Sequence, residues 1–265
     1  MSTPEAIKET VKREYNQIMQ DVENQGVEWW RSRVCEPIYA GIRDTYPDMN
    51  GYVDDANLGL GCGFPVKYSD MKVGDAVLDL GCAAGIDSFI ARQVVGEQGS
   101  VIGMDITPFL IERARRTAEK LGYQNVTFIE GDIEAIPLET NQIDVVISNG
   151  VFSLVPHKER VFAEMYRVLK PEAHFCVSDL VRRSKFLDTL RIATEQFTGC
   201  LNGISHQDEY LRLIVEAGFK NVALREERRV PLPDTLLNEN LNMQEKIAFL
   251  EADKGLFAIT IYGVK

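Results

Sequence analysis

Short, mainly apolar runs alternate with amphipathic stretches over most of the chain. The apolar runs have the length and composition of buried strands and occupy residues 77–80, 101–104, 126–130 and 143–147. Residues 86–95 repeat apolar side chains at helical spacing. A further helix is expected over residues 108–121, after Thr107 as N-cap and before Gly122 as a stop signal. Alternating strands and helices predict a doubly wound, mostly parallel α/β sheet.

Glycine and polar residues follow each of these runs, at the edge where parallel strands end. Gly81 and Gly85 permit a tight turn with close backbone approach, and the free N–H groups of the following helix would face an anionic group. Asp105 comes 24 residues after Gly81, where a doubly wound fold places an acid that binds ribose hydroxyls. The third and fourth runs end in residues 131–133 and 148–150. Together these ends predict a cradle for a nucleotide-like ligand.

The segment Asp79-Leu-Gly-Cys-Ala-Ala-Gly85 resembles the first motif of the class I S-adenosylmethionine-dependent methyltransferases, and the resemblance covers about residues 70–265. A nicotinamide-binding Rossmann domain is the main alternative, but the third glycine of Gly-x-Gly-x-x-Gly is missing. The resemblance implies that the first motif wraps the methionine end of the cofactor S-adenosylmethionine, Asp105 binds its ribose, Asp132 binds its adenine amino group, and Asn149 lines the site. The cofactor-binding residues implied are Asp79, Gly81, Cys82, Ala83, Gly85, Asp105, Ile106, Asp132, Ile133 and Asn149.

The C-terminal part of the chain fits the same class. Residues 174–180 predict a fifth strand, and residues 222–230 and 256–265 resemble the hairpin that closes a methyltransferase sheet with one antiparallel strand. The expected sheet is therefore Rossmann-like and seven-stranded. An insertion at residues 184–219 separates the fifth strand from the sixth, at a position where this fold commonly holds residues that contact the substrate.

The first 70 residues precede the first strand and lie outside the predicted sheet. Residues 2–24 carry apolar side chains at steps of three or four and predict a helix, whereas residues 25–70 predict irregular structure with one short helix. We expect residues 1–70 to form an N-terminal helical arm and lid over the cofactor mouth. Residues 71–265 are then the methyltransferase domain.

Acidic residues outnumber basic ones, 40 against 29, and give a formal net charge of −11. This balance disfavours a surface that neutralises phosphates, so we expect a small-molecule substrate and no nucleic-acid partner. No run approaches the roughly 18 apolar residues that a membrane span requires, and the N-terminus lacks a signal-sequence pattern. We therefore expect a cytoplasmic protein whose five scattered cysteines are reduced. The oligomeric state stays open.

Three further segments, residues 60–65, 144–160 and 166–171, resemble parts of the arsenite methyltransferases. In that family cysteine thiolates hold trivalent arsenic, whose lone pair attacks the methyl group. Thiolates are soft ligands that suit such a centre. Cys62 and Cys200 match two of the family's cysteines. The resemblance implies arsenic as the substrate, and the motifs imply no resident metal ion.

The chain departs from the arsenite methyltransferases at Gly150, where that family has a third cysteine. A three-thiolate site therefore cannot form from these positions, and Cys62 with Cys200 would form a two-thiolate site completed by a small thiol. Cys35 lies upstream of Cys62 near the spacing of a further family cysteine, but its surroundings differ, so we expect it to pack in the arm, with substitution for the missing ligand as the alternative. The remaining cysteines are expected to fill apolar space in the interior, and these are Cys82 and Cys176.

The acceptor decides which catalytic residues the reaction needs. A hydroxyl or an acidic carbon requires a general base, whereas a soft centre with a free lone pair requires none. His206, beside the insertion, is the histidine placed to act as such a base. The candidate catalytic residues are Cys62, Cys200 and His206. Two alternatives to arsenic stay open: an organic small molecule methylated on oxygen, nitrogen or carbon, and a module that binds the cofactor without methyl transfer.

Overall fold

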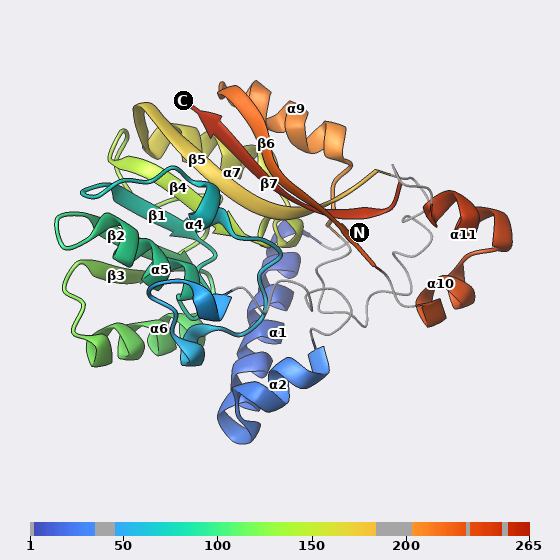
Figure 1. The fold of residues 1–265 in the computed structure, drawn as a ribbon, viewed down its shortest axis with the longest axis horizontal. Helices are drawn as coiled ribbons and strands as arrows, with labels where there is room; N and C mark the ends of the chain where they lie inside the picture. The colour runs from blue at the N-terminus through green and yellow to red at the C-terminus, as the bar shows by residue number, and fades with distance from the viewer. Residues whose placement is uncertain (1–2, 35–45, 184–202, 232–233, 251–253) are drawn as a thin grey trace.

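The computed structural model of the protein describes residues 3–34, 46–183, 203–231, 234–250 and 254–265. These residues contain a seven-stranded sheet with the strand order β3-β2-β1-β4-β5-β7-β6 (Figure 1). Strands β1 to β5 are parallel, and β7 lies antiparallel between β5 and β6. This topology confirms the predicted sheet with one antiparallel strand. The strands are β1 (Ala76–Leu80), β2 (Ser100–Asp105), β3 (Val126–Glu130), β4 (Ile143–Asn149), β5 (Leu169–Arg182), β6 (Lys220–Val230) and β7 (Leu256–Val264).

Helices cover both faces of the sheet, which makes it the middle layer of three. One face carries α4 (Pro65–Tyr68), α5 (Ile86–Val95) and α6 (Pro108–Leu121), and the other carries α7 (Lys158–Val168) and α9 (Gln207–Glu216). Successive residues of a strand point to opposite faces. Val77 therefore joins the core beneath the first group of helices, whereas Leu78 joins the core beneath the second. Both cores hold the strand ends rigidly in place.

The structure confirms the predicted helix over residues 108–121 and lengthens the predicted fifth strand. α7 ends at Val168, and β5 starts at the next residue instead of at residue 174. The extra residues at its C-terminal end pair with the antiparallel strand β7, as Arg182 does with Leu256. Long-range pairing of this kind leaves no local pattern in the sequence, which is why the boundary was missed.

The N-terminal region is more regular than the sequence suggested. Besides α4, its described residues form α1 (Pro4–Gln25), α2 (Val27–Val34) and two short 3₁₀ helices, η1 (Tyr46–Asp48) and η2 (Asp54–Ala56). Thr3 caps α1, because its hydroxyl oxygen accepts from the N–H of Ala6. The end of α2 is tied to the segment before β1: Trp30 Nε1 donates to the Leu58 carbonyl at 3.1 Å, and Arg31 Nε donates to the Asn57 carbonyl at 2.7 Å.

Two helices between β6 and β7 were not predicted. α10 (Asp234–Asn240) and α11 (Met243–Leu250) stand apart from the sheet in Figure 1. A third 3₁₀ helix, η3 (Phe152–Leu154), follows β4. Among the residues that the structure describes, none of the helices combines the length and the apolar character that crossing a membrane requires.

Candidate active site

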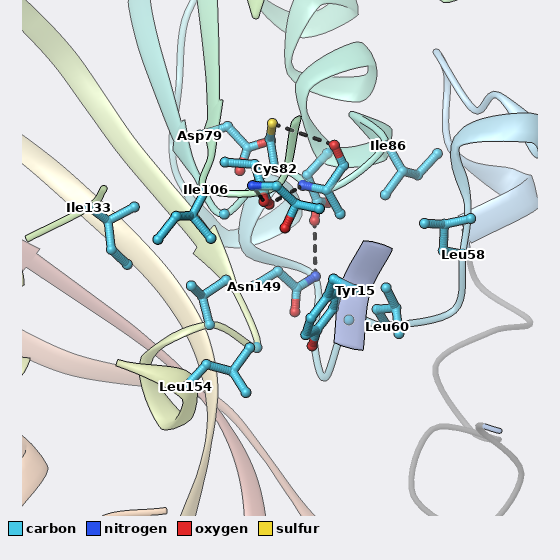
Figure 2. A pocket seen from close by; sticks show the side chains of 18 of the residues that line it. Tyr15, Leu58, Leu60, Asp79, Cys82, Ile86, Ile106, Ile133, Asn149 and Leu154 are labelled. Atoms are coloured by element: carbon cyan, nitrogen blue, oxygen red, sulfur yellow. Dashed lines mark hydrogen bonds between the residues drawn. The ribbon is translucent and has the colours of Figure 1, made fainter. Parts of the chain in front are cut away.

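A cavity opens at the carboxyl ends of β1, β2 and β4, where the strand order reverses from one side of the sheet to the other. Open sheets of this class bind ligands at that point. The cavity holds about 1010 Å³ of space, including open solvent at its mouth. Figure 2 shows Leu58, Ile133 and Leu154 around the cavity together with Asp79 and Asn149.

The cavity brings together residues from four strand ends that the sequence had singled out. Of these predicted cofactor-binding residues, Gly85 is the exception, because it N-caps α5 without lining the cavity. The predicted residues that do line it are Asp79, Gly81, Cys82, Ala83, Asp105, Ile106, Asp132, Ile133 and Asn149.

The two glycines of the first turn are required by the protein's own packing. Gly81 and Gly85 have φ angles of +70° and +93°, a region that favours glycine. A Cβ at Gly81 would collide with the side chain of Val151, and one at Gly85 would lie 2.8 Å from Phe128 Cζ. From the sequence, these glycines were expected to permit a tight turn with close backbone approach to the ligand. The structure adds contacts with the loop after β4 and with β3.

Asp105 organises the turn that faces it. Its Oδ2 accepts from the N–H of Ala83 at 3.0 Å, and its Oδ1 accepts from the N–H of Thr107 at 2.8 Å. The carboxyl group is buried, and burial raises its pKa, although these hydrogen bonds oppose the shift. Asp105 therefore links the glycine turn after β1 to the start of α6.

Asp79 and Asp87 are buried in the wall of the cavity with neutral partners. Asp79 Oδ2 accepts from the Ser88 hydroxyl at 2.6 Å, and Asp87 accepts from the Tyr46 hydroxyl and from Asn149 Nδ2. No basic side chain of the described residues pairs with either carboxyl group. Burial raises the pKa of Asp79 well above its usual range, with the charge of Asp87 acting in the same direction. Burial also raises the pKa of Asp87 to about 6.

Asn149 fastens the segment before α4 to the end of β4. Its Oδ1 accepts from the N–H groups of Cys62 and Gly63, at 2.8 and 3.1 Å. Its Nδ2 donates to the Gly63 carbonyl, to Asp87 and to the Tyr46 hydroxyl. A single amide thus fixes the position of Cys62 relative to the cavity.

Asp132, at the opposite side of the cavity, is ion-paired. Lys8 Nζ lies 2.7 Å from Asp132 Oδ2 and 2.7 Å from Glu134 Oε2. The second oxygens of both carboxylates accept backbone N–H groups, from Glu134 and from His157. Burial lowers the pKa of Lys8, but the hydrogen bonds with the two carboxylates outweigh it, so that this pKa is raised.

Cys62, a predicted catalytic residue, adjoins the cavity without being one of the residues that line it. Its side chain is buried, and its Sγ lies 3.7 Å from the position that a Cβ would occupy at Gly150. Gly150 lines the cavity, and so do Leu60 and Gly61, the two residues that precede Cys62 in the sequence. The residue that replaces the missing thiol is therefore adjacent to Cys62, as the resemblance implied.

Of the other four cysteines, the structure describes two. Cys200 and Cys35 lie outside the described residues. Cys82 lines the cavity and Cys176 is buried in β5, and burial raises the pKa of both thiols. Both are thus neutral thiols in the interior.

His206 is not among the residues that line the cavity. It is the N-cap of α9, and its Nδ1 accepts from the N–H of Asp208 at 3.3 Å. The structure therefore does not bring this candidate base together with Cys62 and the strand ends.

Residues that line the cavity but were not among those predicted from the sequence include Lys8, Tyr15, Tyr46 and Asp87. Asp87 had a detectable signal, because it comes two residues after Gly85 in the first turn of a helix that faces the ligand. Tyr15 had one as well, since it lies on the apolar stripe of α1, whereas Lys8 had none. Tyr46 had none, because its contacts with Asp87 and Gly63 depend on the fold.

Comparisons with known proteins agree with this geometry. A family model described as a methyltransferase domain matches residues 71–218. The arsenite methyltransferase of Halobacterium salinarum is 42% identical over 177 residues, which cover 67% of this chain and 45% of that protein. The human arsenite methyltransferase is 30% identical over 225 residues, which cover 80% of this chain and 58% of that protein. The crystal structure of an arsenic(III) S-adenosylmethionine methyltransferase from Chlamydomonas reinhardtii is 29% identical with a TM-score of 0.63, covering 84% of this chain and 73% of that one.

The fold and the cavity define a Rossmann-like class of enzymes that use S-adenosylmethionine. Because the family match spans more than half of its residues, the chain belongs to the methyltransferase domain family, and its cofactor is S-adenosylmethionine. Its resemblance to arsenite methyltransferases is confirmed. The chain spans about half the length of the curated relatives it matches.

Proposed function

We propose that this chain transfers a methyl group from S-adenosylmethionine to a small-molecule acceptor, trivalent arsenic. The observation that carries the proposal is the position of Cys62: its buried thiol adjoins Gly150, and the two residues before it, Leu60 and Gly61, line the cavity. A thiol at this point suits a soft acceptor held beside the cofactor. The relatives from Halobacterium salinarum and human, both arsenite methyltransferases, support the same acceptor.

The residues of the cavity fit the cofactor in a definite order. The buried carboxyl groups of Asp79 and Asp87, which have no cationic partner in the described part of the chain, suit the positively charged methionine end. Asp105, at the end of the next strand, is then the partner of the ribose hydroxyls, with Ile106 beside it. Asp132 and Ile133, one strand further, form the adenine end. In this placement the methionine end lies nearest to Gly150 and hence to Cys62.

The reaction asks mainly for positioning. When bound, S-adenosylmethionine supplies a methyl group on a positively charged sulfur. The chain's task is to hold the acceptor in line with that methyl group and to exclude water. The apolar side chains of Leu60, Val151 and Leu154 line the cavity and exclude water. Cys62 and Cys200 would hold arsenic as thiolates with its lone pair toward the methyl group, and such an acceptor needs no general base.

The proposal is tested with purified protein, arsenite, a small thiol and labelled S-adenosylmethionine. We expect a methylarsenical to form, and Cys62→Ser and Cys200→Ser each to abolish it. Cys176→Ala is the matched control, because this buried thiol lies in β5 outside the cavity lining and its loss should leave the turnover unchanged. No methylarsenical, or full turnover in both serine variants, would overturn arsenic as the acceptor.

An organic acceptor is the second candidate, and one observation favours it. Gly150 stands where the third thiol is missing, and the adjoining cavity wall of Leu60, Val151 and Leu154 is apolar. That surface suits a carbon skeleton methylated on oxygen, nitrogen or carbon. In this case Cys62→Ser leaves methyl transfer to the organic acceptor intact, whereas substitution of Leu154 by Asp weakens it.

A further inference from the structure

Helix α1 forms one wall of the cavity through side chains at helical spacing. Lys8, Val11 and Tyr15 line the cavity, and Figure 2 shows Tyr15 reaching it from α1. The same face of the helix continues into the core with Ile18, Met19 and Val22. The C-terminal half of α1 is therefore attached by apolar packing. Its N-terminal half is attached differently.

Lys8 joins the N-terminal half of α1 to the residues that follow β3. Its ammonium group lies 2.7 Å from an oxygen of Asp132 and 2.7 Å from an oxygen of Glu134. The Glu134 side chain is only 3% exposed, and that of Lys8 is 22% exposed. The pair thus lies partly out of solvent, where an ion pair is screened less than at the surface.

Both carboxylates are held ready for the lysine by the backbone. Asp132 Oδ1 accepts from the N–H of Glu134 at 2.9 Å, and Glu134 Oε1 accepts from the N–H of His157 at 3.0 Å. Each carboxylate oxygen has two lone pairs, so Asp132 keeps acceptor capacity toward the cavity that it lines. Without Lys8, two neighbouring carboxylates would face each other with no cation between them.

A second ion pair between α1 and the rest of the protein provides a contrast. Arg116 and Glu23 approach to 3.5 Å, but their side chains are 53% and 46% exposed. Exposed pairs of this kind contribute little. Among the described residues, Lys8 is therefore the cation on α1 whose ion pairs reach a cavity-lining carboxylate.

We propose that Lys8 is a positioning residue that orients the Asp132 carboxylate and holds α1 against the cavity, and that it thereby sets the rate at which the cofactor leaves. The proposal rests on the placement of adenine beside Asp132 proposed above. It does not depend on the acceptor, so a failure of the arsenic assay leaves it standing. Cofactor binding tests it without any methyl transfer.

The test measures release of S-adenosylhomocysteine by stopped-flow displacement from the wild type and from Lys8→Met, which keeps the apolar stem and removes the charge. We expect release to become roughly tenfold faster, between the effects of exposed and buried ion pairs. Lys12→Met is the matched control on the same helix, because the ion pair of Lys12 among the described residues is with the exposed Glu9, at 4.0 Å, and this variant should release at the wild-type rate. Lys8→Arg keeps the cation and should restore slow release.

A double-mutant cycle separates positioning from general support of the fold. If Lys8 acts through Asp132, the effect of Lys8→Met shrinks in an Asp132→Ala background. Equal effects in both backgrounds, or wild-type release from Lys8→Met at an unchanged melting temperature, would overturn the proposal. If Lys8→Met lowers the melting temperature, the salt dependence of release from the wild type replaces this comparison. Release that becomes faster as the salt concentration rises supports the proposal, and release that does not change with salt overturns it.

Discussion

The two ends of the cavity differ in the partners of their carboxyl groups. At the end formed by β1 and α5, Asp79 and Asp87 are buried with neutral hydrogen-bond partners, and burial raises the pKa of both. At the end formed after β3, Asp132 and Glu134 share the ammonium group of Lys8. Among the described residues, the first end has no basic side chain paired with its carboxyl groups, which leaves them to be matched by a ligand, whereas at the other end the protein supplies a cation of its own.

This difference matches a cofactor that is charged at one end and neutral at the other. The methionine end carries the ammonium and sulfonium groups, and the adenine end is a neutral ring with a hydrogen-bond donor. Transfer of the methyl group removes the sulfonium charge. The end with Asp79 and Asp87 should therefore distinguish substrate cofactor from product, and the end with Asp132 should not.

Replacing Gly81 by valine should abolish cofactor binding at the end formed by β1 and α5. The new side chain meets Val151 at a backbone angle that favours glycine, so we expect binding of S-adenosylhomocysteine to become undetectable by calorimetry. Gly122→Val is the matched control: Gly122 has the same φ of +70° with nothing within 4 Å of its Cβ position. Tight binding by Gly81→Val would contradict the placement of the turn.

Replacing Asp105 tests the proposed ribose site, which lies between the two ends of the cavity. A charge-assisted contact with ribose contributes about 1.5 to 3 kcal/mol, so Asp105→Ala should weaken cofactor binding about tenfold to a hundredfold. Asp105→Asn keeps acceptors for the N–H groups of Ala83 and Thr107 and should retain more of the affinity. An unchanged Kd in the alanine variant would show that the ribose lies elsewhere.

The uncompensated carboxyl of Asp87 should make stability depend on pH. Its folded pKa of about 6 lies above the unfolded value of about 3.9, so the folded state binds more protons between these values. Stability is then lost as the pH rises from about 4 through about 6, by on the order of 2 to 3 kcal/mol. Chemical denaturation should show this loss in the wild type relative to Asp87→Asn. A difference between the two proteins that stays constant with pH would refute the assignment.

The same substitution should change the preference between cofactor and product. Asp87→Asn removes a negative charge at the methionine end, so we expect it to weaken S-adenosylmethionine binding about tenfold more than S-adenosylhomocysteine binding, a difference of about 1.4 kcal/mol. Calorimetry with both ligands above pH 7 measures the ratio of the two Kd values. A ratio identical to that of the wild type would mean that Asp87 does not sense the sulfur charge.

Replacing Asp132 should have the smallest effect and no preference. Asp132→Asn weakens a hydrogen bond to a neutral ring, which contributes about 0.5 to 1.5 kcal/mol, so both ligands should lose affinity by roughly the same few-fold factor. The paired titrations above provide the measurement. Loss confined to one of the two ligands would break the contrast between the ends.

The predictable part of the site is the part encoded by short sequence distances. The glycine turn, Asp105 and residues 131–133 follow their strands directly, so the order of strands places them at one edge. Lys8 was not predictable, because it meets Asp132 across 124 positions of sequence and a lysine on an amphipathic helix has the pattern of a solvated residue. Asp87 had a signal in its place two residues after Gly85, but an acid in the first turn of a helix is also common for structural reasons.

On the acceptor side of the cavity, the contacts depend on residues far apart in the sequence. The adjacency of Cys62 and Gly150 follows from a hydrogen-bonded clamp at Asn149, which joins segments 87 positions apart. No local pattern announces such a contact, and only the resemblance to arsenite methyltransferases pointed to it. The pairing of Cys62 with Cys200 stays a prediction.

A crystal structure of the chain with S-adenosylhomocysteine tests the contrast between the two ends most directly. The account predicts the amino group of the ligand beside Asp79 and Asp87 and the adenine amino group at Asp132, with Lys8 still in place. An adenine ring lodged against Asp87, or a ligand bound away from both ends, would contradict it.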